Sequence, residues 1–561
     1  MKSILTKYWR EIVLAVAVFI TIAPLMKSGY FPHHDDLQII RLLEIRKCFA
    51  DLQIPCRWVP DMGFGFGYPL YNFYSVFPYY LGGLISYFTS FINTAKILFM
   101  LTQVFAGLGM YLLVKQLFNK NAGLVSSVLY LYAPYKAVDI YVRGALSESF
   151  ALALAPFVFY FLFKLAKKDS LKDFSGLTIS FALFLLTHNI STLLFVPVFA
   201  LVLIYLFLTS KKSLKQILPA LALGVGISAF FTLPAYFEKG LVQTESLTRF
   251  ELNFRSHFVN ISQFISTKWG YGPSVLGEKD SLSFQVGLIH LVLFTSGLLF
   301  LIFYILKIKL PFLDYGKQNK NRVIVLASAV VLFLLSLFMA HYRSAFVWES
   351  FNLLSYVQFP WRFLGLVSFF ASIAGGGIVY FVVKKRQESI ALTLTAFIIA
   401  FNFIYFRPSH MYQITDAQKF SNAHWRAQIK GSILDYLPKT ALEPLEPASS
   451  VPWPAEGEAI ITGFTKNTDS FSFNAQIEKS AKIIVPVFYF PEWKVKMFEG
   501  FISPEYDRFG RIVVNLPAGN YSIEGQLFNT PIRSIGNAIS GVSFILLGGI
   551  LIYAKNKKHK N

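Results

Sequence analysis

Long apolar runs separated by short polar stretches fill the chain up to residue 406, and one more run lies near the C-terminus. A helix needs about 20 predominantly apolar residues to cross a bilayer, and most of these runs approach that length. The pattern predicts an all-α polytopic membrane protein with about twelve transmembrane helices. The predicted spans are residues 12–26, 95–117, 122–134, 148–166, 174–188, 192–209, 217–235, 286–309, 323–341, 362–383, 389–406 and 536–554.

Lysine and arginine clusters lie between alternate spans, which is the pattern of cytoplasmic loops. All of these clusters fall on one side only if the apolar segment 71–90 does not cross the membrane. We therefore predict a large first outer loop over 27–93, in which 71–90 is a re-entrant or in-plane helix. Both termini are then cytoplasmic. No small-residue cleavage site follows the first run, so we expect an uncleaved helix there.

Composition agrees with a membrane protein. Hydrophobic residues make up 55% of the 561 residues and charged residues 15%, with a net charge of +21. A soluble protein of this size carries about 25% charged residues. A strongly basic chain could bind nucleic acid, but here the lysines sit in short clusters between apolar runs. We interpret the charge as membrane topology and predict no nucleic-acid partner.

The first outer loop combines a predicted helix with a glycine-rich turn. Residues 35–52 place charged and apolar side chains on opposite faces, which predicts a helix along the membrane surface. The spacing of the glycines over 63–67 is not a dinucleotide fingerprint, because no strand precedes it. Cys48 and Cys56 could form a disulfide outside the cytosol, whereas two thiols alone are unlikely metal ligands. The sequence leaves this pairing open.

Residues beyond 406 change character and predict a separate outer part. Residues 407–454 are charged and proline-rich, which predicts a partly helical linker. Residues 455–533 contain alternating, β-rich runs with turn residues between them, which predicts a small extracytoplasmic β-sandwich. Residues 534–561 predict the last span and a basic cytosolic tail. The transmembrane module is then residues 1–406.

Chemistry, if the chain performs any, is expected outside, because every inner loop is short and basic. No nucleophile elbow, Walker A loop or zinc-protease motif is present in the sequence. A carboxylate can take a proton from a hydroxyl nucleophile, and an arginine can grip a phosphate. Together they suit transfer of a group from a phospholipid carrier, with the cation stabilising the leaving phosphate. The candidates in the outer loops are Asp35, Asp36, Arg57, Asp139, Arg143, Glu148, His188 and Arg362.

Each candidate also has a structural interpretation, which the sequence leaves open. These are an N-cap for Asp35, a loop-fixing ion pair for Arg143 and Glu148, a snorkelling side chain for Arg362, a hydrogen-bonded core histidine for His188 and an interfacial anchor for Arg57. The two histidines before Asp35 could help bind a divalent ion. No metal-ligand spacing recurs elsewhere, so we predict no metal site and no cofactor, with a divalent cation as the alternative.

Several short motifs, taken in order, resemble a known family. They are His34-Asp-Asp36, Pro55-Cys-Arg-Trp58, Gly63 to Tyr74, Tyr141 to Glu148, Thr187-His-Asn189, Gln358 to Arg362 and Asp435 to Pro438. Together they resemble a bacterial membrane family labelled "6-pyruvoyl-tetrahydropterin synthase-related". The acid pair after the first helix resembles the GT-C superfamily of membrane glycosyltransferases, which includes oligosaccharyltransferases. No soluble pterin-synthase domain or zinc-histidine set is evident.

The resemblance implies an inverting glycosyltransferase in the plasma membrane of a prokaryote. A polyprenyl-phosphate-linked sugar would be the donor, and a glycan, lipid or protein outside the cytoplasm would be the acceptor. Asp35, with Asp36 beside it, would be the general base, and Asp139 matches a second acidic position. Arg57 and Arg143 would contact the lipid phosphate. The pair is Asp-Asp rather than the commoner Asp-Glu, which leaves the acceptor open.

Two other functions compete with this hypothesis. A flippase or transporter of lipid-linked glycans predicts charges near the middle of the bilayer and paired broken helices. A non-catalytic envelope assembly protein would use the outer β-domain as its binding module. The charged residues cluster at the outer ends of the spans, which favours the enzyme.

Overall fold

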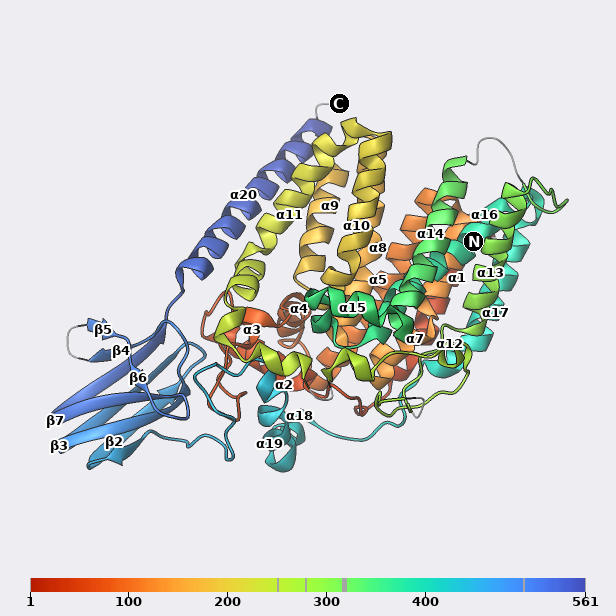
Figure 1. The fold of residues 1–561 in the computed structure, drawn as a ribbon. Coiled ribbons are helices and arrows are strands. Elements are labelled where there is room, and N and C mark those ends of the chain that lie inside the picture. Colours follow the sequence, from red (N-terminus) through yellow and green to blue (C-terminus); the bar gives the residue numbers. More distant parts are fainter. Residues whose placement is uncertain (1, 250–251, 278–279, 315–319, 498–499, 560–561) are drawn as a thin grey trace.

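The computed structural model describes residues 2–249, 252–277, 280–314, 320–497 and 500–559. A bundle of long helices carries a β-sheet at one end, and short helices gather at that same end (Figure 1). Within the described residues, ten helices are long and apolar enough to cross a membrane. Their main helices are α1 (Lys2–Ile22), α5 (Phe91–Leu117), α8 (Leu146–Lys167), α10 (Asn189–Thr209), α11 (Lys211–Phe237), α13 (Leu288–Ile305), α14 (Lys320–Ala340), α16 (Leu364–Phe381), α17 (Gln387–Asn402) and α20 (Pro531–His559). Flanking helical turns extend the spans of α1, α16 and α17, which cover Lys7–Met26, Pro360–Phe381 and Lys384–Tyr405.

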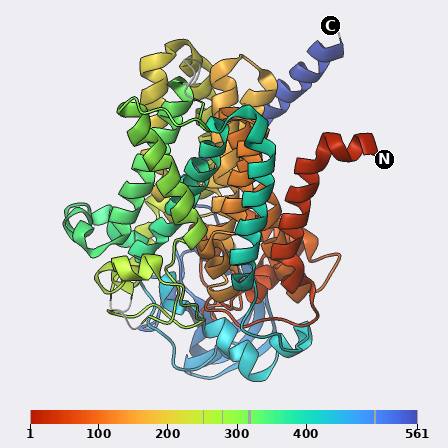
Figure 2. The same ribbon diagram turned by 90° about the vertical axis from the view of Figure 1, so that its right-hand side faces the viewer.

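Two of the twelve predicted spans are shorter helices, α6 (Lys120–Leu131) and α9 (Leu171–Leu185). At 1.5 Å per residue, α6 is about 18 Å long, too short to cross the apolar core of a bilayer unaided. It packs against α5 and α16 inside the bundle. The described chain is thus a multi-spanning membrane protein with ten span-length helices and two short ones. Both termini lie toward the end of the bundle opposite the sheet (Figure 2).

Helix α16 is the most enclosed of the span-length helices and packs against α6, α13 and α14. Its glycine run lets α6 approach closely, because a Cβ on Gly376 would lie only 1.9 Å from Ser126 Oγ. Ser126 Oγ donates a hydrogen bond of 2.7 Å to the Ser372 carbonyl. Small residues and interhelical hydrogen bonds of this kind hold helices together where no hydrophobic driving force exists.

The segment between α1 and α5, predicted as the first outer loop and named the first outer segment here, contains α2 (Gln38–Ala50), α3 (Leu70–Phe73) and α4 (Phe77–Ile85). The apolar segment 71–90 forms no helix of span length, as the charge pattern predicts. The helix predicted within 35–52 is present and its place at the membrane surface stays a prediction, but part of its charged face is not exposed. Arg41 and Glu44, on the charged face of α2, are buried like its apolar face, because later parts of the chain cover that face.

The described residues between 407 and 530 contain α18 (Asp416–Lys419), α19 (Asn422–Lys430) and seven strands. The strands are β1 (Trp453–Glu456), β2 (Ala459–Lys466), β3 (Ser470–Phe488), β4 (Trp493–Met497), β5 (Gly500–Ile502), β6 (Glu505–Tyr506) and β7 (Arg511–Leu527). All pairings are antiparallel, and β3 and β7 pair over most of their length. Hydrogen bonds join the strands into a single sheet in the order β1-β3-β7-β4-β5, with β2 on β3 and β6 on β7. The predicted antiparallel β-domain is therefore present as one continuous sheet, not as two separately bonded ones.

The sheet is docked on the first outer segment. Phe66 stacks on Phe488 at 4.8 Å between ring centroids, and Trp58 meets Trp493 edge-on at 5.7 Å. Lys466 Nζ, from β2, donates to the Gly65 carbonyl at 2.7 Å. Aromatic pairs of this kind contribute about 0.5–1.5 kcal/mol each beyond their buried area. The loop that follows α2 is thus held between the bundle and the sheet.

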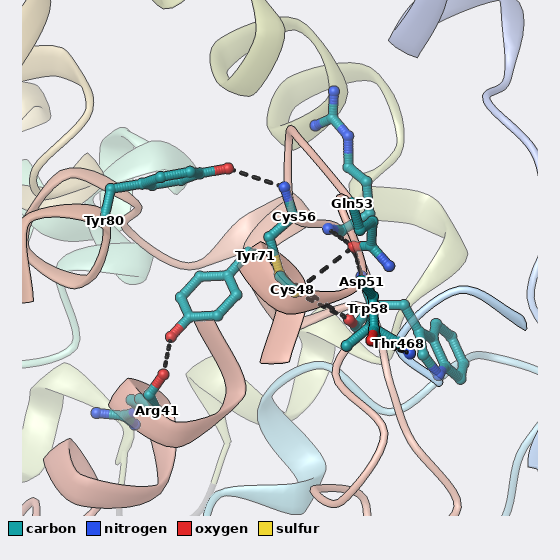
Figure 3. The surroundings of a disulfide bond; sticks show 10 residues. Arg41, Cys48, Asp51, Gln53, Cys56, Trp58, Tyr71, Tyr80 and Thr468 are labelled. Carbon is teal, nitrogen blue, oxygen red and sulfur yellow. Dashed lines mark hydrogen bonds between the residues drawn. A yellow bond between two sulfur atoms is a disulfide. The ribbon is translucent and has the colours of Figure 1, made fainter. Parts of the chain in front are cut away.

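A disulfide closes the turn that follows α2. Cys48, in the last turn of the helix, is bonded to Cys56, and both are buried (Figure 3). The amide of Cys56 donates to the Tyr80 hydroxyl at 2.8 Å, and Asp51 Oδ2 accepts from the amide of Thr468. The bond therefore fixes the position from which the following residues reach both the bundle and the sheet.

Candidate functional site

The paired aspartates lie on a short extended segment that is hydrogen-bonded to the start of the second outer loop. The amide of His34 donates to the Val142 carbonyl at 3.0 Å, and the amide of Asp35 to the Arg143 carbonyl at 2.9 Å. Gly144, with φ of +64°, makes room for the His33 ring, since a Cβ there would lie 1.8 Å from His33 Cδ2. This pairing brings residues 108 positions apart to one place.

Asp35 is oriented by cationic and amide groups of α2. Its Oδ2 accepts from Arg41 Nη1 at 2.8 Å and from Gln38 Nε2 at 3.2 Å, and the side chain is 33% exposed. The Arg41 guanidinium lies over the Tyr74 ring at 4.3 Å and bonds its hydroxyl at 3.1 Å. Asp35 does not cap α2, whose first residues carry no side-chain cap in the described structure. The N-cap interpretation is therefore wrong.

Asp36 points to a different cation. Its Oδ2 lies 2.6 Å from Lys419 Nζ, and the carboxylate is 37% exposed while Lys419 is buried. The ammonium also lies over the Tyr30 ring at 5.2 Å. Burial lowers the pKa of the neighbouring His33, against the opposing charge of Asp36, so we expect a neutral imidazole there. The two aspartates thus keep partial access to solvent while each is held by one cation.

A third carboxyl group, that of Asp435, lies near Arg41, the arginine that holds Asp35. Asp435 is half-buried, and burial raises its pKa to about 6, opposed by the charge of Arg41 and reinforced by that of Asp35. Tyr436 lies close by, 6.2 Å from Tyr74 between ring centroids. Asp35, Asp36 and Asp435 therefore lie in one region. The cations of this region are Arg41 and Lys419, and tyrosine side chains line it.

The remaining acids and cations form a buried cluster behind the Val142–Gly144 segment. Arg143 Nη1 bonds Asp139 and lies 2.9 Å from Glu148 Oε2, and Arg362 Nε lies 3.6 Å from the same oxygen. His188 is close enough to interact with the charge of Glu148; burial lowers the pKa of this histidine to about 3. The cluster thus unites five of the eight predicted residues, from three different loops.

The local geometry explains these contacts. Asp139 lies on a π-helical turn, Val138–Val142, and Arg143 directly follows this turn with helical backbone angles. The two residues are four positions apart, so their side chains share one face. Burial raises the pKa of Asp139, with the charge of Glu148 adding to the rise and Arg143 opposing it. The guanidinium of Arg143 also stacks on Trp361 at 4.5 Å. The loop-fixing pair between Arg143 and Glu148 exists, and Arg362 is held inside the protein.

Arg57 does not join either group. Its guanidinium donates to Asn72 Oδ1 at 3.3 Å and to Asn537 Oδ1 at 2.9 Å. Burial lowers its pKa to about 10, and the nearby Arg533 adds to that effect. Arg533 in turn pairs with Glu238 at 2.9 Å. Arg57 therefore links the first outer segment to the start of α20.

Sequence reasoning missed Arg41, Lys419 and Asp435 as members of the candidate site. Arg41 lies on the charged face of the helix that was predicted to run along the membrane surface, and Lys419 gave no signal. Asp435 does have a signal in the sequence, because it is the first residue of one of the motifs on which the family resemblance rests. Among the described residues, no group of three or more His, Cys, Asp or Glu side chains is arranged to hold a metal ion. The divalent cation stays an untested alternative.

The fold defines a polytopic membrane protein with a β-sheet domain at one end. The chain belongs to the family described as "6-pyruvoyl-tetrahydropterin synthase related domain; membrane protein", whose model matches residues 71–409. This confirms the family that the motifs predict. Asp35, Asp36 and Arg57 precede the matched range.

Other known proteins are similar over parts of the chain. An uncharacterised protein of Lactococcus lactis subsp. cremoris is 24% identical over 236 residues, which are 39% of this chain and 38% of that protein. The arabinofuranosyltransferase AftD from Mycobacteria has a TM-score of 0.45 at 15% identity, over 75% of this chain and 28% of that one. This chain thus spans about a quarter of that enzyme's length and less than half of the Lactococcus protein's.

Two further solved structures are similar at lower TM-scores. The oligosaccharyltransferase AglB from Archaeoglobus fulgidus, in complex with an inhibitory peptide and a dolichol-phosphate, gives 0.41 at 13% identity, over 81% of this chain and 62% of that one. ArnT from Cupriavidus metallidurans, bound to undecaprenyl phosphate, gives 0.31 at 12% identity, over 66% and 78%.

Proposed function

We propose that this protein is an inverting glycosyltransferase of a prokaryotic plasma membrane, with its active site on the extracytoplasmic side and both termini in the cytoplasm. It would move a sugar from a polyprenyl-phosphate donor to a glycan, lipid or protein acceptor. The single observation that carries the proposal is the pair of partly exposed aspartates held by Arg41 and Lys419 beside a buried acid–arginine cluster. This arrangement lies at the end of the bundle that bears the sheet (Figure 1).

In this proposal Asp35 is the general base. Its Oδ1 makes no hydrogen bond that competes with an acceptor in the described structure, whereas Oδ2 is held by Arg41 and Gln38. The free oxygen would take the proton of the acceptor as the acceptor atom bonds to the anomeric carbon. The bond from that carbon to the phosphate oxygen breaks on the opposite face, and the polyprenyl phosphate leaves with the bonding electrons.

The leaving phosphate requires cations. Arg143 and Arg362 are the candidates that lie nearest to the aspartate segment through the Val142–Gly144 pairing, and Arg57 lies elsewhere. Asp139 and Glu148 already neutralise much of their charge, so we assign these two arginines to shaping the phosphate site. Arg41 and Lys419 face the partly exposed side and are better placed for direct contact.

The test uses the full chain in its own host. Strains carrying a deletion, Asp35→Asn or Asp36→Asn are compared with wild type by mass spectrometry of polyprenyl-phosphate sugars and of envelope glycans. We expect the deletion and Asp35→Asn to accumulate the same lipid-linked sugar and to lose the same glycan. Glu245→Gln is the matched control, since Glu245 forms an ion pair of 2.8 Å with Lys439 on the exposed surface.

The result that would refute catalysis by this pair is normal glycan in both aspartate variants. Accumulation of the lipid-linked sugar on the cytoplasmic leaflet in the deletion strain would favour a flippase instead. Equal thermal stability of the variants and wild type in detergent separates loss of chemistry from loss of folding.

A further inference from the structure

A cavity of about 580 Å³ lies away from the aspartates, where two span-length helices meet the outer polar region. Three segments line it: Met26–Gly29 after α1, Ser90–Lys96 at the start of α5, and Ile414–Ala417 before and within α18. Met26 closes the first candidate span, and the second begins at Phe91. The cavity is therefore level with the membrane surface, where lipid headgroups lie.

The cavity contains a cation that the described residues do not neutralise. Lys96 is 4% exposed, and its ammonium donates to the carbonyls of Lys27 at 2.9 Å and Gly29 at 3.0 Å. It forms no ion pair with any described carboxylate. Burying an ammonium is costly unless it is paired. Two carbonyls use two of its three protons, and Lys27 adds a second, exposed cation to the lining.

The acid in the lining does not balance these charges. Asp416 accepts from the amides of Phe91 at 2.7 Å and Ile92 at 3.1 Å, so its carboxylate serves the first turn of α5. Hydroxyl and amide side chains complete the polar part of the lining, from Ser28, Ser90, Asn93 and Thr415. Two cations surrounded by small neutral donors suit an anion with several oxygens.

We propose that this cavity binds a phosphate group, either the headgroup of an outer-leaflet phospholipid or free phosphate. Lys96 and Lys27 supply the charge, and Ser28 and Asn93 supply hydrogen bonds. The site is separate from the aspartate pair and does not depend on the proposed sugar transfer. It is nevertheless connected to that pair, because α18 lines the cavity with Asp416 and Ala417 and places Lys419 on Asp36 at its other end.

The test measures binding to the full chain purified in a maltoside detergent, which contains no phosphate. Native mass spectrometry counts retained phosphatidylglycerol, and equilibrium dialysis measures radioactive inorganic phosphate. We expect one saturable site for at least one of the two probes. Binding of the lipid alone assigns the site to a headgroup, and binding of inorganic phosphate assigns it to the free anion.

Two variants test the location. Lys96→Met should abolish binding, but it also removes two hydrogen bonds to carbonyls and could unfold the region. Asn93→Asp avoids this problem, because an acid in the first turn favours a helix while it repels phosphate. We expect at least tenfold weaker binding in Asn93→Asp and unchanged binding in Lys268→Met, which removes an exposed lysine outside the cavity. Absence of binding in wild type, or equal binding in Asn93→Asp, would overturn the proposal.

Discussion

Replacing Gly144 with alanine should displace the segment that carries Asp35 and Asp36, although neither aspartate is itself changed. Gly144 has φ of +64°, and a Cβ at this position would lie 1.8 Å from His33 Cδ2 and 2.6 Å from His33 Cγ. An ordinary contact is 3.4 Å or longer, so the imidazole has to retreat by about 1.6 Å. Because His33 is buried and packs against Tyr30, Phe31 and Phe99, it cannot move alone.

Two contributions set the size of the effect. Holding alanine in the left-handed region costs about 1–2 kcal/mol. Overfilling a packed site costs about 1–3 kcal/mol more, so the free energy of unfolding should fall by roughly 2–5 kcal/mol. The shift also strains the bonds from His34 and Asp35 to Val142 and Arg143. We therefore expect loss of the proposed transfer activity even in the protein that stays folded.

The assay combines thermal unfolding in detergent with the glycan readout described above. Gly240→Ala is the control, since a Cβ there meets no atom within 4 Å. Adding His33→Ala to Gly144→Ala removes the overlap and leaves only the backbone strain, so the double variant should be less destabilised than the sum of the single ones. Additive effects, or a Gly144→Ala protein as stable as wild type, would refute this reasoning.

Two further predictions concern the same outer region. The cysteines of the Cys48–Cys56 bond are 8 positions apart. Reducing this bond frees the loop in the unfolded chain and should lower the free energy of unfolding by roughly 2.5 kcal/mol. The prediction is contradicted if reductant leaves the thermal midpoint unchanged, or if a maleimide reacts with these thiols in the unreduced protein. Burial raises the pKa of Asp435 to about 6, so its neutral form is favoured in the folded state. Stability should then fall between about pH 4 and 6 as the pH rises, by at most about 3 kcal/mol. Asp435→Asn should remove this part of the pH dependence, and a parallel pH profile for wild type and variant would show that Asp435 ionises freely.

The sequence alone determined the class of fold. The free energy of moving a segment from water into the membrane depends on that segment's own side chains. Run length and charge clusters therefore located the spans and indicated that 71–90 forms no span-length helix. The alternation of side chains in 455–533 located the strands, because successive side chains of a strand point to opposite faces of a sheet.

Tertiary structure decided which ions meet. Arg41 and Glu44 have the helical spacing of a solvent-facing stripe, yet they are buried because Asp61 and Asp435 come to lie on that face. Arg57 was expected beside the lipid phosphate, yet its guanidinium is bonded to Asn72 of α3 and Asn537 of α20. Lys419 meets Asp36 across more than 380 residues of chain. Periodicity reports the faces of one element, whereas the partner of a buried charge depends on which distant element covers it, and no local pattern encodes that choice.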